Sequence, residues 1–153
     1  MSLRTGDTIP DFTLKDQNGN DFHSLSLIGK QPLVLFFYPK DFTPGCTKEV
    51  CNFRDHYESF VDLGAHVVGI SSDSQQSHHR FSQKYSLSFQ LLADKGGKVR
   101  KFFGVPGAVL GLLPGRETYV FDKDGKVIML FNSIRADNHV NKALKALLKL
   151  KEA

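Results

Sequence analysis

Three short apolar runs, at residues 33–38, 67–71 and 89–93, form the framework of the chain. Residues 33–38 are apolar at consecutive positions rather than at alternate ones. This pattern is typical of a central strand that is covered on both faces, and the other two runs also have the length of buried strands. We therefore expect three strands in the interior of the molecule.

Between these runs, apolar side chains recur at spacings of three and four, the pattern of an amphipathic helix. After the first run, the repeating set is Val50, Phe53, Tyr57 and Phe60. We expect one helix there, which begins near Cys46 and ends before Gly64. Residues 74–85 form a second expected helix, on which Phe81 and Tyr85 share a face.

Turn signals organise the rest of the chain. Asn18-Gly19 separates residues 9–14 from residues 22–25 and predicts a small N-terminal hairpin. Residues 122–126 separate residues 118–121 from residues 127–131 and predict a second hairpin. A short helix is expected at 97–103, a loop at 105–115 and a closing helix at 137–150. The apolar stripe of the closing helix consists of Val140, Ala143, Leu144, Leu147 and Leu148.

Strands that alternate with helices, followed by a hairpin and a last helix, predict an α/β fold. We expect a mixed central β-sheet with helices on both faces, an extra N-terminal β-hairpin, and a single domain of residues 1–153. The net charge of +4 is dispersed along the chain, so no nucleic-acid binding is expected. No apolar run approaches the length of a membrane span, and the N-terminus lacks the apolar stretch of a signal peptide. We expect a soluble intracellular protein that does not bind membranes.

Both cysteines of the chain, Cys46 and Cys51, lie at the start of the first expected helix. Thr43 is a good N-cap, and Pro44 suits the first helical position. Cys46 then falls in the first turn, where unpaired backbone N–H groups and the helix dipole favour a thiolate. The thiolate is the reactive form of cysteine, so Cys46 is the more reactive of the two.

The spacing of the two cysteines restricts what they can do. Positions five apart in a regular helix have Cα atoms separated by roughly 8.6 Å, whereas a disulfide needs about 7 Å or less. A bond between Cys46 and Cys51 would require the first turns to unwind. Two inert core cysteines, a metal pair and a disulfide oxidoreductase remain alternatives, although four intervening residues match neither a common zinc site nor a C-x-x-C motif.

The residues around Cys46 carry a family resemblance. Residues 39–46 match the P-x-x-x-T-x-x-C signature of the peroxiredoxins, and residues 43–51 closely resemble the Q-type members, also called bacterioferritin comigratory proteins. Residues 12–19, 53–55 and 67–71 also look like that family, and 113–123 is similar to its cyanobacterial and plant plastid members. The resemblance implies a thioredoxin-like fold and a thiol-dependent peroxidase that needs no metal or organic cofactor.

The same resemblance assigns roles to the two cysteines and to three other side chains. Cys46 would be the peroxidatic cysteine and Cys51 the resolving one. Thr43 would hydrogen-bond the peroxide through its hydroxyl. Its plain role is the helix N-cap, and one hydroxyl can accept from a backbone N–H and donate to a ligand at the same time. Arg116 would stabilise the thiolate and the departing oxygen, with a surface charge as the plain alternative. Glu49 would orient Arg116, although a carboxylate on a helix surface is the simpler interpretation.

Pro39, Pro44 and Gly45 complete the expected substrate pocket, with Pro39 shielding the sulfur. Phe42 stands where relatives often have a polar residue, at the expected pocket rim. Hydrogen peroxide and alkyl hydroperoxides are the expected substrates, and thioredoxin the expected reductant, with glutaredoxin as a second candidate. We expect a monomer in a bacterial cytoplasm, or in a plastid if the chain is a mature plant form.

Two other functions use the same features. A peroxide sensor would pass oxidation of its thiols to a partner protein, and a binding module would leave the thiols unreacted. The pair His78-His79 could suggest a metal site. It lies on a polar helix, however, and adjacent helical positions point in different directions, so we expect a solvated surface instead. The remaining histidines, His139 among them, show no ligand spacing.

Overall fold

The main sheet has five strands, in the order β5-β4-β3-β6-β7. The computed structural model describes residues 3–105 and 115–152. The strands are β3 Leu33–Phe37, β4 His66–Ser71, β5 Gln90–Ala93, β6 Glu117–Phe121 and β7 Val127–Asn132. β3 pairs in parallel with β4 and antiparallel with β6. The predicted mixed sheet is confirmed, with β3 at its centre.

β3 separates two cores. Its side chains alternate between the faces of the sheet, as the pleat of a strand requires. Val34 and Phe36 belong to one core, whereas Leu33, Leu35 and Phe37 belong to the other. All five residues are buried, which explains why the run is apolar at consecutive positions.

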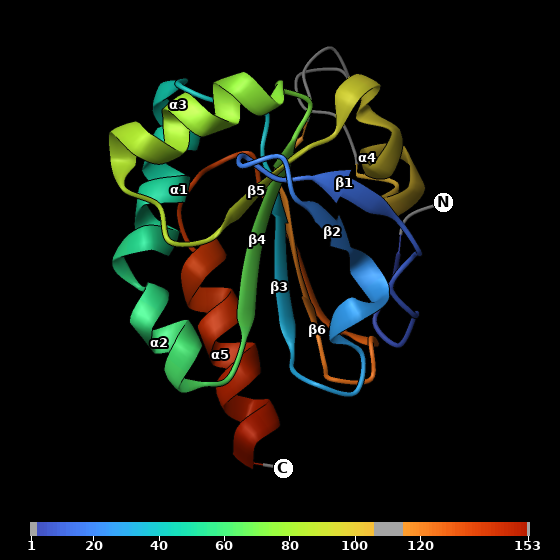
Figure 1. Cartoon of the computed structure of the whole chain (residues 1–153). Coiled ribbons are helices and arrows are strands. Elements are labelled where there is room, and N and C mark those ends of the chain that lie inside the picture. The colour runs from blue at the N-terminus through green and yellow to red at the C-terminus, as the bar shows by residue number, and fades with distance from the viewer. Residues whose placement is uncertain (1–2, 106–114, 153) are drawn as a thin grey trace.

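Helices cover both faces of the sheet (Figure 1). The helices over the first core are α1 Pro44–Asp55, α2 Tyr57–Asp62, α3 Gln75–Tyr85 and α5 His139–Glu152. The second core is covered by α4 Lys98–Phe103 and by a separate hairpin of β1 Thr13–Lys15 and β2 Asp21–His23. Short 3-10 turns, Ser24–Leu27 and Lys95–Gly97, connect these elements. The N-terminal hairpin and the α/β class are confirmed.

The single helix expected after β3 is wrong in one respect, because it divides into α1 and α2 at His56. His56 has φ −106° and ψ 11°, outside the helical range, and its Nδ1 lies 2.9 Å from the carbonyl oxygen of Asn52. The apolar face nevertheless continues across the break, since Phe53 and Phe60 are both buried and their rings stack at 5.7 Å. The periodicity of apolar residues therefore predicts the buried face of the two helices but not the break at His56.

The closing helix starts at His139 rather than at residue 137, and Leu148 is 50% exposed, so it does not belong to the buried stripe. Most of the loop expected at 105–115 lies outside the described residues. In the part of the chain that the structure describes, no helix combines the length and the apolar character needed to cross a bilayer.

Candidate active site

Cys46 lies where the chain passes from the central strand to α1. β3 ends at Phe37, and α1 begins at Pro44, which occupies the first helical position as predicted. Cys46 is therefore the third residue of the helix, and it is 1% exposed. The sulfur faces the first core beside the positive end of a helix, and this end favours a negative charge.

Two N–H donors approach the sulfur. The backbone N–H of Lys40 and the Nη2 group of Arg116 each donate to Cys46 Sγ at 3.5 Å. A thiolate accepts hydrogen bonds better than a thiol, and a neighbouring guanidinium adds a full positive charge. Both donors and the charge of Arg116 thus favour negative charge on the sulfur.

Arg116 lies just before β6. Besides the Cys46 sulfur, two oxygen acceptors hold its guanidinium. Nε donates to the carbonyl oxygen of Ile134 at 3.0 Å, and Nη1 donates to Glu49 Oε1 at 2.5 Å. Burial alone lowers the pKa of Arg116, but the charges of Glu49 and Cys46 outweigh it and leave the pKa above its usual value. Arg116 is therefore a permanent cation, and its position is fixed from two sides.

Glu49 is fully buried on the inner face of α1, so the interpretation as a surface carboxylate is wrong. Burial raises the pKa of Glu49 to about 7, although the ion pair with Arg116 opposes this rise. Among the described residues, its Oε2 has no hydrogen-bond partner. This oxygen lies 3.5 Å from Nδ1 of the buried His139.

His139 stands at the start of α5 and connects Glu49 to the sheet. Its Nδ1 lies 2.8 Å from Thr118 Oγ1, and its Nε2 lies 3.0 Å from the carbonyl oxygen of Ser133. Burial lowers the pKa of His139 to about 4, and the charge of Arg116 lowers it too. The ring is neutral at ordinary pH, and since Nε2 donates to a carbonyl, Nδ1 accepts from Thr118.

Thr43 occupies the N-cap position of α1, but its side chain makes no capping bond. The hydroxyl instead donates to the carbonyl oxygen of Lys40 at 2.7 Å. The expected bond from a helix N–H to this hydroxyl is therefore wrong. A hydroxyl has one hydrogen and two lone pairs, so Thr43 Oγ1 can still accept a hydrogen bond from a ligand.

The other expected pocket residues lie in the same loop and helix start. Pro39 is half-buried, and Pro44 and Gly45 are exposed. A Cβ at Gly45 would lie 3.2 Å from Nη2 of Arg116, which is tighter than an ordinary contact. Glycine at this position lets the guanidinium approach the sulfur.

Cys51 lies further along α1, is half-buried, and is a free thiol like Cys46. The pKa of Cys51 is raised, chiefly because the thiol is partly buried. The charge of Arg54 opposes this rise, and the charge of Asp55 adds to it. Cys51 is thus held as a thiol while α1 is intact. The structure brings Cys46, Arg116, Glu49 and Thr43 together at one site, and keeps Cys51 on the same helix.

Comparisons with known proteins extend over nearly the whole chain. The AhpC/TSA family model matches residues 5–129. Peroxiredoxin Q, chloroplastic, from Sedum lineare is 54% identical over 147 residues, which cover 95% of this chain and 78% of the relative. The chain belongs to the peroxiredoxin Q family. The Arabidopsis thaliana peroxiredoxin Q, chloroplastic, is 52% identical, over 95% of this chain and 67% of the relative.

Solved structures of peroxiredoxin Q type share the fold. Peroxidoxin BcpB from Mycobacterium tuberculosis superposes with a TM-score of 0.88 and 41% identity, covering 97% of this chain and 98% of its own. The predictions of a thioredoxin-like peroxiredoxin and of a thiol-dependent peroxidase are therefore confirmed. With two cysteines, the protein fits the atypical two-cysteine type.

The sequence did not reveal the supporting part that Arg100 plays in this peroxiredoxin site. Arg100 donates to the carbonyl oxygens of Tyr38 at 2.9 Å and of Gly115 at 2.7 Å, so it bridges the ends of the strands that flank the site. Burial lowers the pKa of Arg100, while the nearby Asp94, Cys46 and Glu117 raise it. The sequence offers no spacing signal that separates this arginine from the others.

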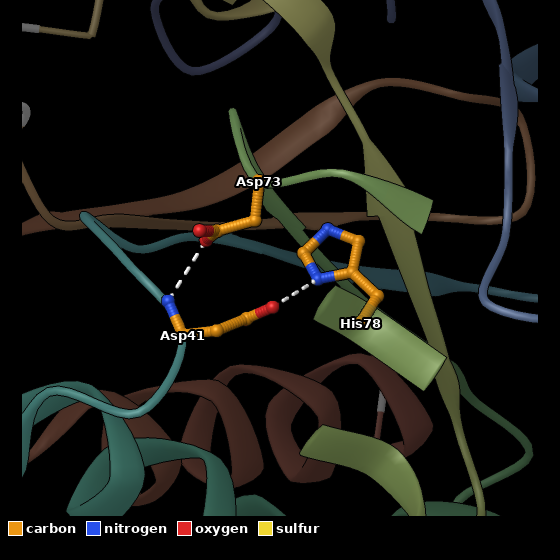
Figure 2. A group of neighbouring side chains, drawn as sticks. All are labelled: Asp41, Asp73 and His78. Atoms are coloured by element: carbon orange, nitrogen blue, oxygen red, sulfur yellow. Dashed lines mark hydrogen bonds and ion pairs between the residues drawn. The ribbon is translucent and has the colours of Figure 1, made fainter. Parts of the chain in front are cut away.

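His139 and His78 do carry a signal, because each shares a helical face with buried residues. His139 lies four residues before the buried Ala143, and His78 lies three before the buried Phe81. The prediction of a solvated His78 is wrong, since the ring is fully buried against Asp41, as Figure 2 shows. His79, by contrast, is exposed as expected.

Asp41, Asp73 and His78 lie close enough to suggest a metal site (Figure 2). Their ligand atoms are already engaged in hydrogen bonds within the protein. Asp41 Oδ2 lies 2.7 Å from His78 Nδ1 and accepts from Ser77, while Asp73 Oδ2 accepts from the backbone N–H of Asp41 at 2.8 Å. We interpret the cluster as a hydrogen-bond network.

Proposed function

We propose that Cys46 is the peroxidatic cysteine and Cys51 the resolving one. The Cys46 thiolate attacks one oxygen of a hydroperoxide, the O–O bond breaks, and with one proton the other oxygen leaves as water or alcohol. Cys46 becomes a sulfenic acid. The Cys51 thiol then attacks this sulfur, which forms a disulfide and releases water. A dithiol reductant restores both thiols by exchange and leaves as a disulfide.

The observation that carries this proposal is the buried Cys46 sulfur with two N–H donors and a fixed arginine. The positive charge of Arg116 stabilises the thiolate, and it also stabilises the negative charge that develops on the departing oxygen. Thr43 accepts a hydrogen bond from the peroxide O–H, because its own hydrogen is committed to Lys40. Pro39, Pro44 and Gly45 line the approach to the sulfur.

The second step requires a change of structure. Cys46 and Cys51 are five positions apart on an intact helix, so their Cα atoms are separated by roughly 8.6 Å. The first turns of α1 must unwind before the sulfurs can bond. The helix is folded for the peroxide step and locally unfolded for the disulfide step.

We further propose hydrogen peroxide and alkyl hydroperoxides as substrates and thioredoxin as reductant, with glutaredoxin as the alternative. One solved relative, from Xanthomonas campestris, is 29% identical and is described by its alkyl peroxide reduction activity, which supports the alkyl substrates. We propose that the protein acts as a monomer. The curated relatives are named chloroplastic, which supports a plastid; a bacterial cytoplasm is the alternative compartment.

Stopped-flow oxidation of two single variants tests these roles. Cys46→Ser should consume no hydrogen peroxide above the rate of buffer alone. Cys51→Ser should react with the first equivalent of peroxide as the wild type does, but should lose turnover with thioredoxin. Retained turnover in Cys46→Ser would refute the assignment. A wild-type protein that is oxidised by peroxide but not recycled by thioredoxin would instead be a sensor.

A further inference from the structure

The loop before α1 is tied to α3 through Asp41, which is 3% exposed. Figure 2 shows its carboxylate directed at His78 and its backbone N–H directed at Asp73. The carboxylate also accepts from Tyr38 Oη at 2.6 Å and from Ser77 Oγ at 2.9 Å. One residue of the loop thus bonds to the end of β3 and to the first turn of α3.

His78 completes this connection on the other side. Its Nε2 lies 2.9 Å from the carbonyl oxygen of Leu92 in β5, and its Nδ1 lies 2.7 Å from Asp41 Oδ2. A carbonyl only accepts, so Nε2 carries a hydrogen. The Asp41 carboxylate that Nδ1 contacts also accepts from Tyr38 and Ser77, so His78 is one of three side chains that hold it. The ring is fully buried, and the other ionisable groups in this network are Tyr38 and Asp73.

Asp41 has functional groups of the site on both sides. Lys40, just before it, donates to the Cys46 sulfur, and Thr43, two residues after it, donates to the Lys40 carbonyl. A shift of Asp41 would therefore displace the Lys40 N–H from the Cys46 sulfur and would also move Thr43, which is bonded to Lys40.

Phe42 lies between the anchored part of the loop and α1. Its φ of 65° is in the left-handed region, which a bulky residue rarely adopts. The ring packs on Phe81 of α3 with centroids 4.9 Å apart, and it is 43% exposed. The chain before Phe42 is bound to α3, whereas α1 begins two residues after it. A strained residue at such a boundary is suited to absorb a change of backbone direction.

We propose that His78 is a positioning residue for the peroxidase reaction. Through Asp41 it fixes the loop that holds Lys40 and Thr43 near Cys46. It also makes Phe42 the point at which the unwinding of α1 stops. The inference rests on the proposed Cys46–Cys51 cycle. On this inference α3 stays in place while the first turns of α1 unwind and refold.

Two amide substitutions separate the bonds that His78 makes. The amide nitrogen of Asn lies near the position of Nδ1, so His78→Asn keeps the bond to Asp41 and loses the one to Leu92. The amide nitrogen of Gln lies near Nε2, so His78→Gln keeps the bond to Leu92 and loses the one to Asp41. His79→Gln, at the exposed neighbouring position, is the matched control.

The rate of the first oxidation is the first measurement. His78→Asn should stay within about twofold of the wild type, because the charged acceptor keeps its donor. His78→Gln should be slower by about tenfold or more, since a hydrogen bond to a charged group commonly contributes that much. If His78 only stabilises the fold, both variants should lose activity in proportion to the decrease in their melting temperatures. That result, or equal rates for the two variants, overturns the proposal.

The fate of the sulfenic acid is the second measurement. Cys46 sulfenic acid either condenses with Cys51 or reacts with a second peroxide molecule, which breaks its O–O bond, gives a sulfinic acid and releases water or alcohol. Without its anchor the loop opens together with α1. His78→Gln should therefore form less sulfinic acid per turnover than the wild type, and His78→Asn the same amount. Mass spectrometry at increasing peroxide concentration measures this ratio, and more sulfinic acid in His78→Gln contradicts the proposal.

The wild-type protein provides a test that does not depend on the folding of variants. NMR of the ring nitrogens should show the same signature of a His78 ring hydrogen-bonded to Asp41 and Leu92 in the reduced and the oxidised protein, because the anchor persists while α1 unwinds. Loss of that signature in the disulfide form overturns the inference. If the oxidised protein contains no Cys46–Cys51 bond, the proposed function fails instead, and mass mapping distinguishes the two failures.

Discussion

Arg116 connects two buried acceptors, the Cys46 sulfur and the Glu49 carboxylate. It does so with separate nitrogens of one planar guanidinium, while its Nε is held by the Ile134 carbonyl. A lysine has one point charge and no rigid fork, so it cannot serve both partners in this geometry.

Arg116→Lys should therefore slow the reaction of Cys46 with hydrogen peroxide by about 10²-fold or more, the size of effect seen when one preorganised donor is lost. Stopped-flow kinetics at a single pH measure it. Arg135→Lys, at an exposed position, should leave the rate unchanged. A rate for Arg116→Lys close to that of the wild type would show that charge alone is sufficient.

Glu49 and His139 are buried together and have opposite pH dependences. The pKa of Glu49 is about 7 in the folded protein against a usual 4.5, so its contribution to stability is full below 4.5 and is lost as pH rises through 7. The pKa of His139 is about 4 against a usual 6.5, so its contribution is full above 6.5 and is lost as pH falls through 4. Between 4.5 and 6.5 the two slopes oppose each other.

Glu49→Gln removes one of these slopes. Its free energy of unfolding should rise, relative to that of the wild type, as pH increases from 4.5 to 7. Urea denaturation at several pH values measures the difference. Glu58→Gln, at an exposed carboxylate of α2, should show no such trend. A constant difference for Glu49→Gln across this range would mean that Glu49 is ionised throughout.

At the scale of elements, α1 has two requirements that conflict. In the proposed cycle it must be folded to place Cys46 beside Arg116, and it must lose its first turns for Cys46 to reach Cys51. Thr47 lies between the two cysteines, and its backbone N–H donates to the Thr43 carbonyl at 2.9 Å. Its β-branched side chain lowers the helix propensity of this segment.

Substitutions at Thr47 should therefore change the rate of disulfide formation. Ala and Gly differ in helix propensity by about 1 kcal/mol. If unwinding limits this step, Thr47→Gly should form the disulfide up to about fivefold faster than Thr47→Ala. Rapid-quench mass spectrometry after one equivalent of peroxide measures the rates. Identical rates for the two variants would show that unwinding of α1 is not limiting.

The sequence was informative about which elements form and less so about their faces. Residues 33–38 and 67–71 predicted β3 and β4 because buried strands are apolar at consecutive positions. The polar composition around His78 predicts a solvated side chain, whereas its spacing of three from Phe81 places it on the buried face of α3. The break at His56 left no periodic signal, since Phe53 and Phe60 stay on one face across it.

At the scale of the whole molecule, the central strand β3 carries the site. Phe36 belongs to β3, and its ring stacks on the ring of Phe53 in α1 with centroids 4.2 Å apart. Gly69 in the neighbouring strand leaves room for that ring, since a Cβ there would lie 2.7 Å from Phe36 Cζ and 3.0 Å from Leu91 Cδ2. The site thus depends on close packing between strands.

Gly69→Ala should destabilise the protein by about 1–3 kcal/mol, the usual result of overpacking a core. Chemical denaturation measures the change. Val61→Ala, at an exposed position of α2, should stay within about 0.5 kcal/mol of the wild type. Unchanged stability of Gly69→Ala would mean that the packing of β3 against β4 is looser than the distances indicate.

The pairing of distant residues was the part of the site that spacing could not predict. Cys46 and Arg116 are 70 residues apart, and only the resemblance connected them before the structure placed Nη2 3.5 Å from the sulfur. Arg100 and His139 come from α4 and α5, and their positions depend on the whole fold. Local patterns specify a helix start, whereas the charges around it come from tertiary structure.

The central claim is that α1 is folded for peroxide reduction and unwound in the disulfide. Hydrogen exchange of wild-type protein before and after one equivalent of hydrogen peroxide, with the disulfide mapped by mass spectrometry, tests it most directly. The account predicts a Cys46–Cys51 bond, and lost protection of the amides at the start of α1 through residue 51 while β3 stays protected. A mapped Cys46–Cys51 bond in which these amides keep their protection would contradict it.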